Sequence, residues 1–79
     1  MSVYRGTIAS VPFKGPKGMG MKINIPDLKE TFACWVDKEL VPTDTNGYLY
    51  GSGVEIAVSR MYASGRDIRL NITSIKLVK

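Results

Sequence analysis

Residues 13–21 combine side chains that could do chemistry with residues that could shape a loop around them. The stretch carries one aromatic ring, two lysines and three glycines, and it has no acidic residue. Gly and Pro favour tight turns, so the stretch is typical of a flexible hairpin tip. A basic, aromatic loop on a small β scaffold suits a polyanion with exposed flat bases, such as single-stranded nucleic acid. An ordinary glycine-rich turn made soluble by its lysines explains the same residues.

Two kinds of side chain along the chain could bind such a ligand. Basic side chains would neutralise phosphates and give an affinity that falls with salt, and aromatic rings would stack on bases. The predicted nucleic-acid-binding residues are Arg5, Phe13, Lys14, Lys17, Lys22, Tyr48, Tyr50, Arg60, Arg66 and Arg69. The alternative is structural: the lysines would be solvated surface residues, Phe13 would pack over the end of the fold, and the arginines would protect an edge strand from aggregation.

The charges are unevenly distributed along the chain, whose net charge is +4. Residues 1–25 hold four basic residues and no acid, and residues 59–79 hold five basic residues and one acid. The middle, residues 26–58, holds two basic and six acidic residues. If the two ends pair in space, one face of the protein becomes basic.

The composition argues against the common catalytic and metal sites. The chain has no His and a single Cys, which removes the usual zinc sites and every His-based catalytic dyad. The seven acidic residues show no clustered ligand spacing, and Cys34, with no His to activate it, is interpreted as a buried small residue. We therefore expect no enzyme, no catalytic residue, no metal and no cofactor.

The length and hydropathy predict one small domain, residues 1–79, that has no membrane partner. No basic segment followed by an apolar run marks a signal peptide, and no stretch approaches the roughly 18 consecutive apolar residues of a membrane span. The single cysteine excludes an internal disulfide. We expect a cytoplasmic protein, in the cytoplasm of a host cell if the gene is viral.

Alternating apolar residues predict strands over residues 3–11, 19–25, 54–59 and 68–73, and a near-continuous apolar run predicts a fifth over 31–36. This fifth strand is expected to be buried on both faces or to lie at a dimer seam, with Trp35 filling the core. Gly6 predicts a bend or bulge, and the shift of apolar parity between Ile72 and Ile75 predicts a bulge near Thr73. The expected fold is all-β, a small five-stranded OB-like barrel; an SH3-like barrel has the same strand count.

The second half of the chain resembles a known family in the order of its motifs. Tyr50-Gly51-Ser52-Gly53 precedes an alternating strand, Tyr62 precedes a turn at Gly65, and residues 72–78 form a terminal apolar strand with one Lys before Leu-Val. This order resembles the filamentous-phage single-stranded DNA-binding proteins of the gene-five type. The Gly- and Lys-rich residues 14–20 are similar in position and composition to the basic DNA-binding wing of that family.

The resemblance implies an OB-like barrel and a two-fold homodimer made through the hairpin at residues 61–67, with Met61 and Tyr62 in the dimer interface. It also implies sequence-neutral coating of single-stranded DNA in phage or plasmid replication; RNA is the other candidate ligand. A different class remains open, namely a small phage or plasmid accessory module that binds a host factor through exposed strand edges. A structural subunit of a larger assembly is the third hypothesis.

Overall fold

The computed structural model describes residues 2–78, which form a single six-stranded β-sheet. Two short 3-10 turns, η1 (Pro26–Leu28) and η2 (Lys38–Leu40), are the only helical elements in that part of the chain. The predicted all-β class is therefore confirmed. The strands are β1 (Ser2–Ile8), β2 (Phe13–Gly15), β3 (Gly18–Ile25), β4 (Glu30–Asp37), β5 (Gly53–Ser64) and β6 (Asp67–Leu77).

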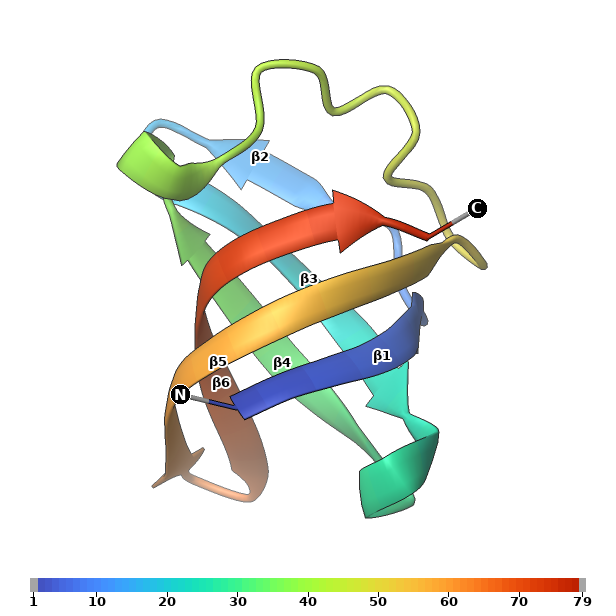
Figure 1. Cartoon of the computed structure of the whole chain (residues 1–79). Helices are drawn as coiled ribbons and strands as arrows, with labels where there is room; N and C mark the ends of the chain where they lie inside the picture. The colour runs from blue at the N-terminus through green and yellow to red at the C-terminus, as the bar shows by residue number, and fades with distance from the viewer. Residues whose placement is uncertain (1, 79) are drawn as a thin grey trace.

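Five of the strands close into a ring. The sheet runs in the order β1-β5-β6-β4-β3-β2, and β1 also pairs with β3. The β4–β6 pair is parallel and the other pairs are antiparallel. Figure 1 shows β1, β5 and the end of β6 in a front layer, with β2, β3 and β4 behind. Five ring strands in this order fit an OB-like architecture.

The interior of the ring is apolar. No polar or charged residue is buried within residues 2–78. The strand parities predicted from the sequence are confirmed, because the alternate apolar residues of β3, β5 and the first half of β6 all point inward. The buried residues are Ile8, Met19, Met21, Ile23, Ile25, Phe32, Cys34, Val36, Tyr48, Val54, Ile56, Val58, Leu70, Ile72 and Ile75.

Two irregularities bend the long β5–β6 hairpin. Ala57 pairs with Ser74 and Val58 with Ile72, so Thr73 is an extra residue on β6, as the parity shift predicts. The next pair joins Arg60 to Asn71, which leaves Ser59 as an extra residue on β5. This second irregularity was not predicted. Together they allow the first half of β6 to leave the front layer and pair with β4.

Residues 31–36 form part of a strand, as predicted, but this strand is not buried on both faces, which was one of the two placements expected for it. Strand β4 buries Phe32, Cys34 and Val36 on one face only, while Trp35 is half-buried on the other. The predicted placement of Trp35 in the core is therefore wrong. A ring of five strands has one interior, so alternate residues of each strand must point outward.

Gly6 lies where β1 passes close to β3. A Cβ atom on Gly6 would lie 2.5 Å from the carbonyl oxygen of Asn24 and 2.7 Å from Cγ2 of Ile23. These distances are too short for non-bonded atoms, so any side chain at this position would push the two strands apart. The absence of a side chain thus allows the ring to close, a role related to the predicted bend.

We predict that Gly6→Ala destabilises the protein by about 1–3 kcal/mol, the usual cost of overpacking a tight site. Urea unfolding followed by circular dichroism measures this change. Gly53→Ala is the matched control, because it lies on the same β1–β5 ladder and its Cβ would meet its nearest neighbour at 3.7 Å. Equal midpoints for the two variants would contradict the proposed role of Gly6 in ring closure.

Candidate nucleic-acid interface

The strand register places one row of outward-facing residues across five strands. Phe13 lies opposite Gly20, Gly20 opposite Trp35, Trp35 opposite Asn71, and Asn71 opposite Arg60. Directly paired residues share one face of a sheet. We call these five residues the aromatic row.

A second row lies beside the first, and each of its residues is two positions from the first-row residue of the same strand. Lys22 of β3 lies opposite Ala33, Ala33 opposite Arg69, and Arg69 opposite Tyr62. We call these four residues the basic row, and the two rows together the outer face. Aromatic rings on β2, β4 and β5 thus alternate with basic side chains on β3 and β6.

The indole ring of Trp35 lies over two glycines of β3. A Cβ atom on Gly20 would lie 3.3 Å from Cε3 of the ring, and one on Gly18 would lie 2.9 Å from Cζ2. The ring nitrogen Nε1 donates a hydrogen bond to Oδ1 of Asp37 at 3.0 Å. Because the glycines have no side chains, the ring can lie close to the backbone of β3. The hydrogen bond from Nε1 to Asp37 fixes the orientation of the ring.

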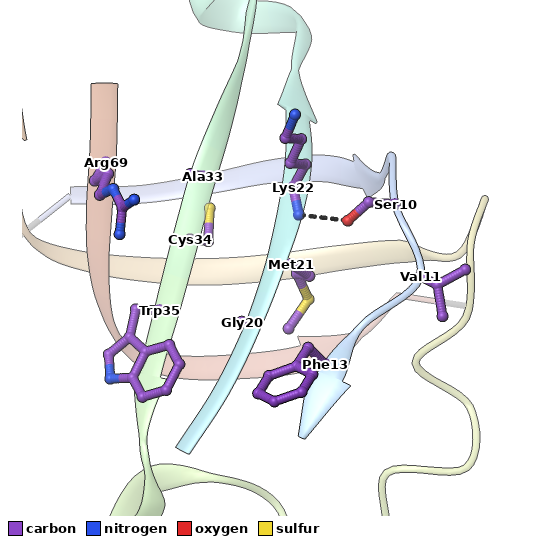
Figure 2. Close-up of a pocket in the computed structure, with 10 residues that line it drawn as sticks. All are labelled: Ser10, Val11, Phe13, Gly20, Met21, Lys22, Ala33, Cys34, Trp35 and Arg69. Atoms are coloured by element: carbon purple, nitrogen blue, oxygen red, sulfur yellow. Dashed lines mark hydrogen bonds between the residues drawn. The ribbon is translucent and has the colours of Figure 1, made fainter. Parts of the chain in front are cut away.

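Phe13 has a similar setting on β2. A Cβ atom on Gly15 would lie 3.0 Å from Cε1 of the phenyl ring, and 68% of Phe13 is exposed. Figure 2 shows the rings of Phe13 and Trp35 on either side of Gly20. The exposed ring of Phe13 and the half-buried ring of Trp35 are two apolar surfaces on the outer face.

The glycine-rich stretch forms the hairpin that the sequence predicts. Gly15 pairs with Gly18 across a two-residue turn, and Gly18 pairs in turn with Asp37 of β4. The amide of Lys38 donates a hydrogen bond to the carbonyl of Lys17 at 3.1 Å, which joins the turn to η2. The glycines therefore belong to a paired hairpin.

A hollow of about 280 Å³ lies on the outer face. Phe13 and Trp35 line it together with the basic residues Lys22 and Arg69 (Figure 2). Ser10 closes one side, where its Oγ accepts a hydrogen bond from the amide of Lys22 at 2.8 Å. The hollow is smaller than the usual enclosed pocket for a drug-sized ligand, and its walls suit a flat, anionic ligand on a surface.

Tyr48 is not part of this interface, which corrects its prediction as a stacking residue. It is only 7% exposed and lies in the core. Its hydroxyl donates a hydrogen bond to the carbonyl of Ile75 at 3.2 Å, and burial raises the pKa of the phenol. A ring packed on both sides cannot stack on a base.

Arg5 lies in the front layer, away from the outer face. Its Nε is 3.4 Å from a carboxylate oxygen of Glu55, and Nζ of Lys76 is 3.2 Å from the other oxygen. The hydrogen bond and charge of Lys76, assisted by Arg5, hold the pKa of Glu55 below its usual value. The fold therefore places the predicted binding residue Arg5 apart from Phe13, Lys22 and Arg69.

The remaining predicted residues do not line the hollow. Lys14 pairs with the buried Met19 and so points to the opposite side of β2 from Phe13. Lys17 and Arg66 are exposed in the turns of the two hairpins, and Tyr50 is exposed in the loop before β5. The guanidinium carbon of Arg60 lies 5.3 Å from the ring centroid of Tyr62, within the range of a cation–π contact.

Cys34 lies beneath this face and is poorly suited to act as a nucleophile. Burial raises the pKa of its thiol to about 12. Within residues 2–78, no three His, Cys, Asp or Glu residues lie close enough together to hold a metal ion. None of the helices in the same range is long and apolar enough to cross a membrane.

Comparison of the chain with protein-family models, with curated proteins and with solved structures gives no match. The fold and the site define the class: a small all-β protein, five of whose strands close into a ring that carries an aromatic and basic outer face.

Proposed function

We propose that this protein binds single-stranded DNA across the outer face and coats it in phage or plasmid replication, in the cytoplasm and without strong sequence preference. The observation that carries the proposal is the exposed ring of Phe13 and the half-buried ring of Trp35, which lie over glycines and line one hollow together with Lys22 and Arg69. Exposed rings beside basic residues are the usual means by which proteins hold single strands.

The spacing of the side chains supports a role for each. Phe13 and Trp35 lie two strands apart, about 10 Å, which leaves room for bases to stack on each ring separately. Stacking on an aromatic ring contributes about 1–3 kcal/mol per base and tolerates any sequence. Lys22 and Arg69 would contact phosphates and release bound counterions. An unpaired strand offers both its bases and its backbone to such a face, whereas a duplex hides the faces of its bases.

We predict that short DNA oligonucleotides quench the fluorescence of Trp35, the only tryptophan, because a stacked base covers the exposed face of its ring. Trp35→Leu should weaken binding by about 1–3 kcal/mol in a polarisation assay with a labelled oligonucleotide. Tyr50→Leu is the control, an exposed aromatic residue that does not line the hollow. Equal loss of affinity in both variants would contradict stacking on Trp35.

An RNA oligonucleotide of the same sequence tests the alternative ligand.

The salt dependence of binding identifies the phosphate contacts. Lys22→Ala and Arg69→Ala should each reduce the slope of log affinity against log salt by about one, because each removes one phosphate contact. Arg5→Ala should leave the slope unchanged, since Arg5 lies beside Glu55 in the front layer and not on the outer face. A salt slope that changes in Arg5→Ala but not in Lys22→Ala would place the binding site in the front layer. Absence of binding at low salt would favour the interaction module that acts on a host factor.

We further propose that two copies pair through the β5–β6 hairpin. Within the described residues, β5 pairs with β1 only as far as Val58, so residues 60–64 have one strand edge without a partner. Met61 lies on this segment and is 49% exposed, and Tyr62 is half-buried beside it. Free strand edges and exposed apolar side chains both favour association.

Met61→Glu should shift the protein from dimer to monomer in light scattering coupled to size-exclusion chromatography, because the carboxylate would lose its water at the interface. Val11→Glu is the control, since Val11 is equally apolar, more exposed and distant from this hairpin along the sequence. A monomeric wild-type protein at high concentration would contradict the dimer and leave the DNA-binding face unaffected.

A further inference from the structure

Asp37 places a carboxylate at one end of the outer face, directly beside Trp35. The two residues are separated by one position on β4, so their side chains lie on the same face of the sheet. Oδ1 of Asp37 accepts the hydrogen bond from Nε1 of the indole at 3.0 Å. Asp37 is exposed, so its carboxylate retains capacity to accept further hydrogen bonds from a ligand.

The order of groups along β4 gives the outer face a direction. Ala33, Trp35 and Asp37 follow one another in steps of about 7 Å. Ala33 lies between Lys22 and Arg69 in the basic row. The indole therefore lies between two cations on one side and one carboxylate on the other.

This order determines how a nucleotide would lie on Trp35. The basic row attracts the phosphates, whereas Asp37 repels them. A base stacked on the indole would then have its sugar and phosphate toward Lys22 and Arg69. Its hydrogen-bonding edge would point toward the carboxylate of Asp37.

We propose that Asp37 is a specificity-determining residue that favours bases with an exocyclic amino group over thymine and uracil at the Trp35 position; this rests on the proposed function. An ionised carboxylate only accepts hydrogen bonds. Cytosine offers its N4 amino group, which Asp and Glu side chains accept from in protein–DNA complexes. Uracil and thymine have a carbonyl oxygen in place of that amino group, and this oxygen repels a carboxylate. Their one donor on this edge, the N3–H group, lies between two such oxygens, so a carboxylate that approaches it meets repulsion from both. The preference adds a modest bias to otherwise sequence-neutral binding.

Two other charges lie near this end of the face. Lys17 and Lys38 are joined through the hydrogen bond between their backbones, next to the pair formed by Gly18 and Asp37. If the phosphates followed these lysines instead, Asp37 would face the backbone of the nucleic acid rather than the edge of a base. The two arrangements give different results with a variant that removes the charge of Asp37.

The test compares oligo(dC) with oligo(dU) of equal length, at neutral pH or slightly above, so that cytosine is uncharged. Both are pyrimidines without the thymine methyl group, so their difference is confined to the hydrogen-bonding edge of the base. We expect the wild-type protein to bind oligo(dC) roughly 5- to 10-fold more tightly, as one specific hydrogen-bonding contact to a base edge allows. Asp37→Asn should abolish or reverse this preference. Its amide oxygen can still accept the hydrogen bond from Trp35, so the ring keeps its support.

Lys22→Ala is the matched control, which should weaken binding of both oligonucleotides and leave their ratio unchanged. Equal affinity of the wild-type protein for the two would overturn the inference. An Asp37→Asn variant that binds both more tightly with the ratio unchanged would also overturn it, because Asp37 would then act only on the phosphates. Failure of the wild-type protein to bind either oligonucleotide would instead contradict the proposed function.

Discussion

The parallel pairing of β4 with β6 is the contact on which both the ring and its outer face depend. It joins residues 33–36 to residues 69–72, which are distant in sequence, and it brings the buried Leu70 and Ile72 beside Cys34 and Val36. Full burial of such aliphatic side chains contributes about 1.5–3 kcal/mol each, which offsets the entropy of closing so long a loop. The same pairing places Arg69 next to the strand that carries Trp35. The closure of the core and the assembly of the outer face therefore depend on the same strand pairing.

The small ring explains why an aromatic surface exists on the outside. Each strand of the ring must turn alternate residues outward, and on β4 one of these is the large side chain of Trp35. Gly18 and Gly20 allow the indole to lie flat, so that one face of the ring is covered by backbone. Side chains at these positions would lift the ring away from the sheet. The arrangement leaves apolar surface exposed to water, which favours binding of a flat ligand.

Local patterns in the sequence predict the strands well. Alternation indicates which residues of β3, β5 and β6 point inward, and the parity shift locates the bulge at Thr73, because both signals depend on neighbouring residues. The position of Trp35 is missed because residues 32–36 are all apolar, although Phe32, Cys34 and Val36 share one parity and Trp35 has the other. Tyr48 follows a turn-forming Asn-Gly pair. No local pattern indicates that its hydroxyl donates a hydrogen bond to a carbonyl of β6.

The candidate site is predicted only in part, since its assembly depends on strand pairing. Phe13, Lys22, Arg60 and Arg69 are foreseen from residue type, and the fold brings them to one face together with the unforeseen Trp35. Arg5 is of the same type, but the pairing of β1 with β5 sets it opposite Glu55. No sequence pattern within β4 or β6 indicates that these two strands pair in parallel. The set of residues on the outer face could therefore not be derived from the sequence.

The distribution of charge follows from the same pairings. The sequence predicts one basic face if the two basic ends of the chain pair, and basic residues of the two ends lie near one another in two separate places. In the front layer, Glu55 lies between Arg5 and Lys76 and offsets one of their two positive charges. On the outer face, Lys22, Arg60 and Arg69 form no ion pair within residues 2–78, and Asp37 engages the indole of Trp35. Three cations without an ion pair in that range therefore lie on the same face as the rings of Phe13 and Trp35, where an anionic ligand with flat bases could contact both.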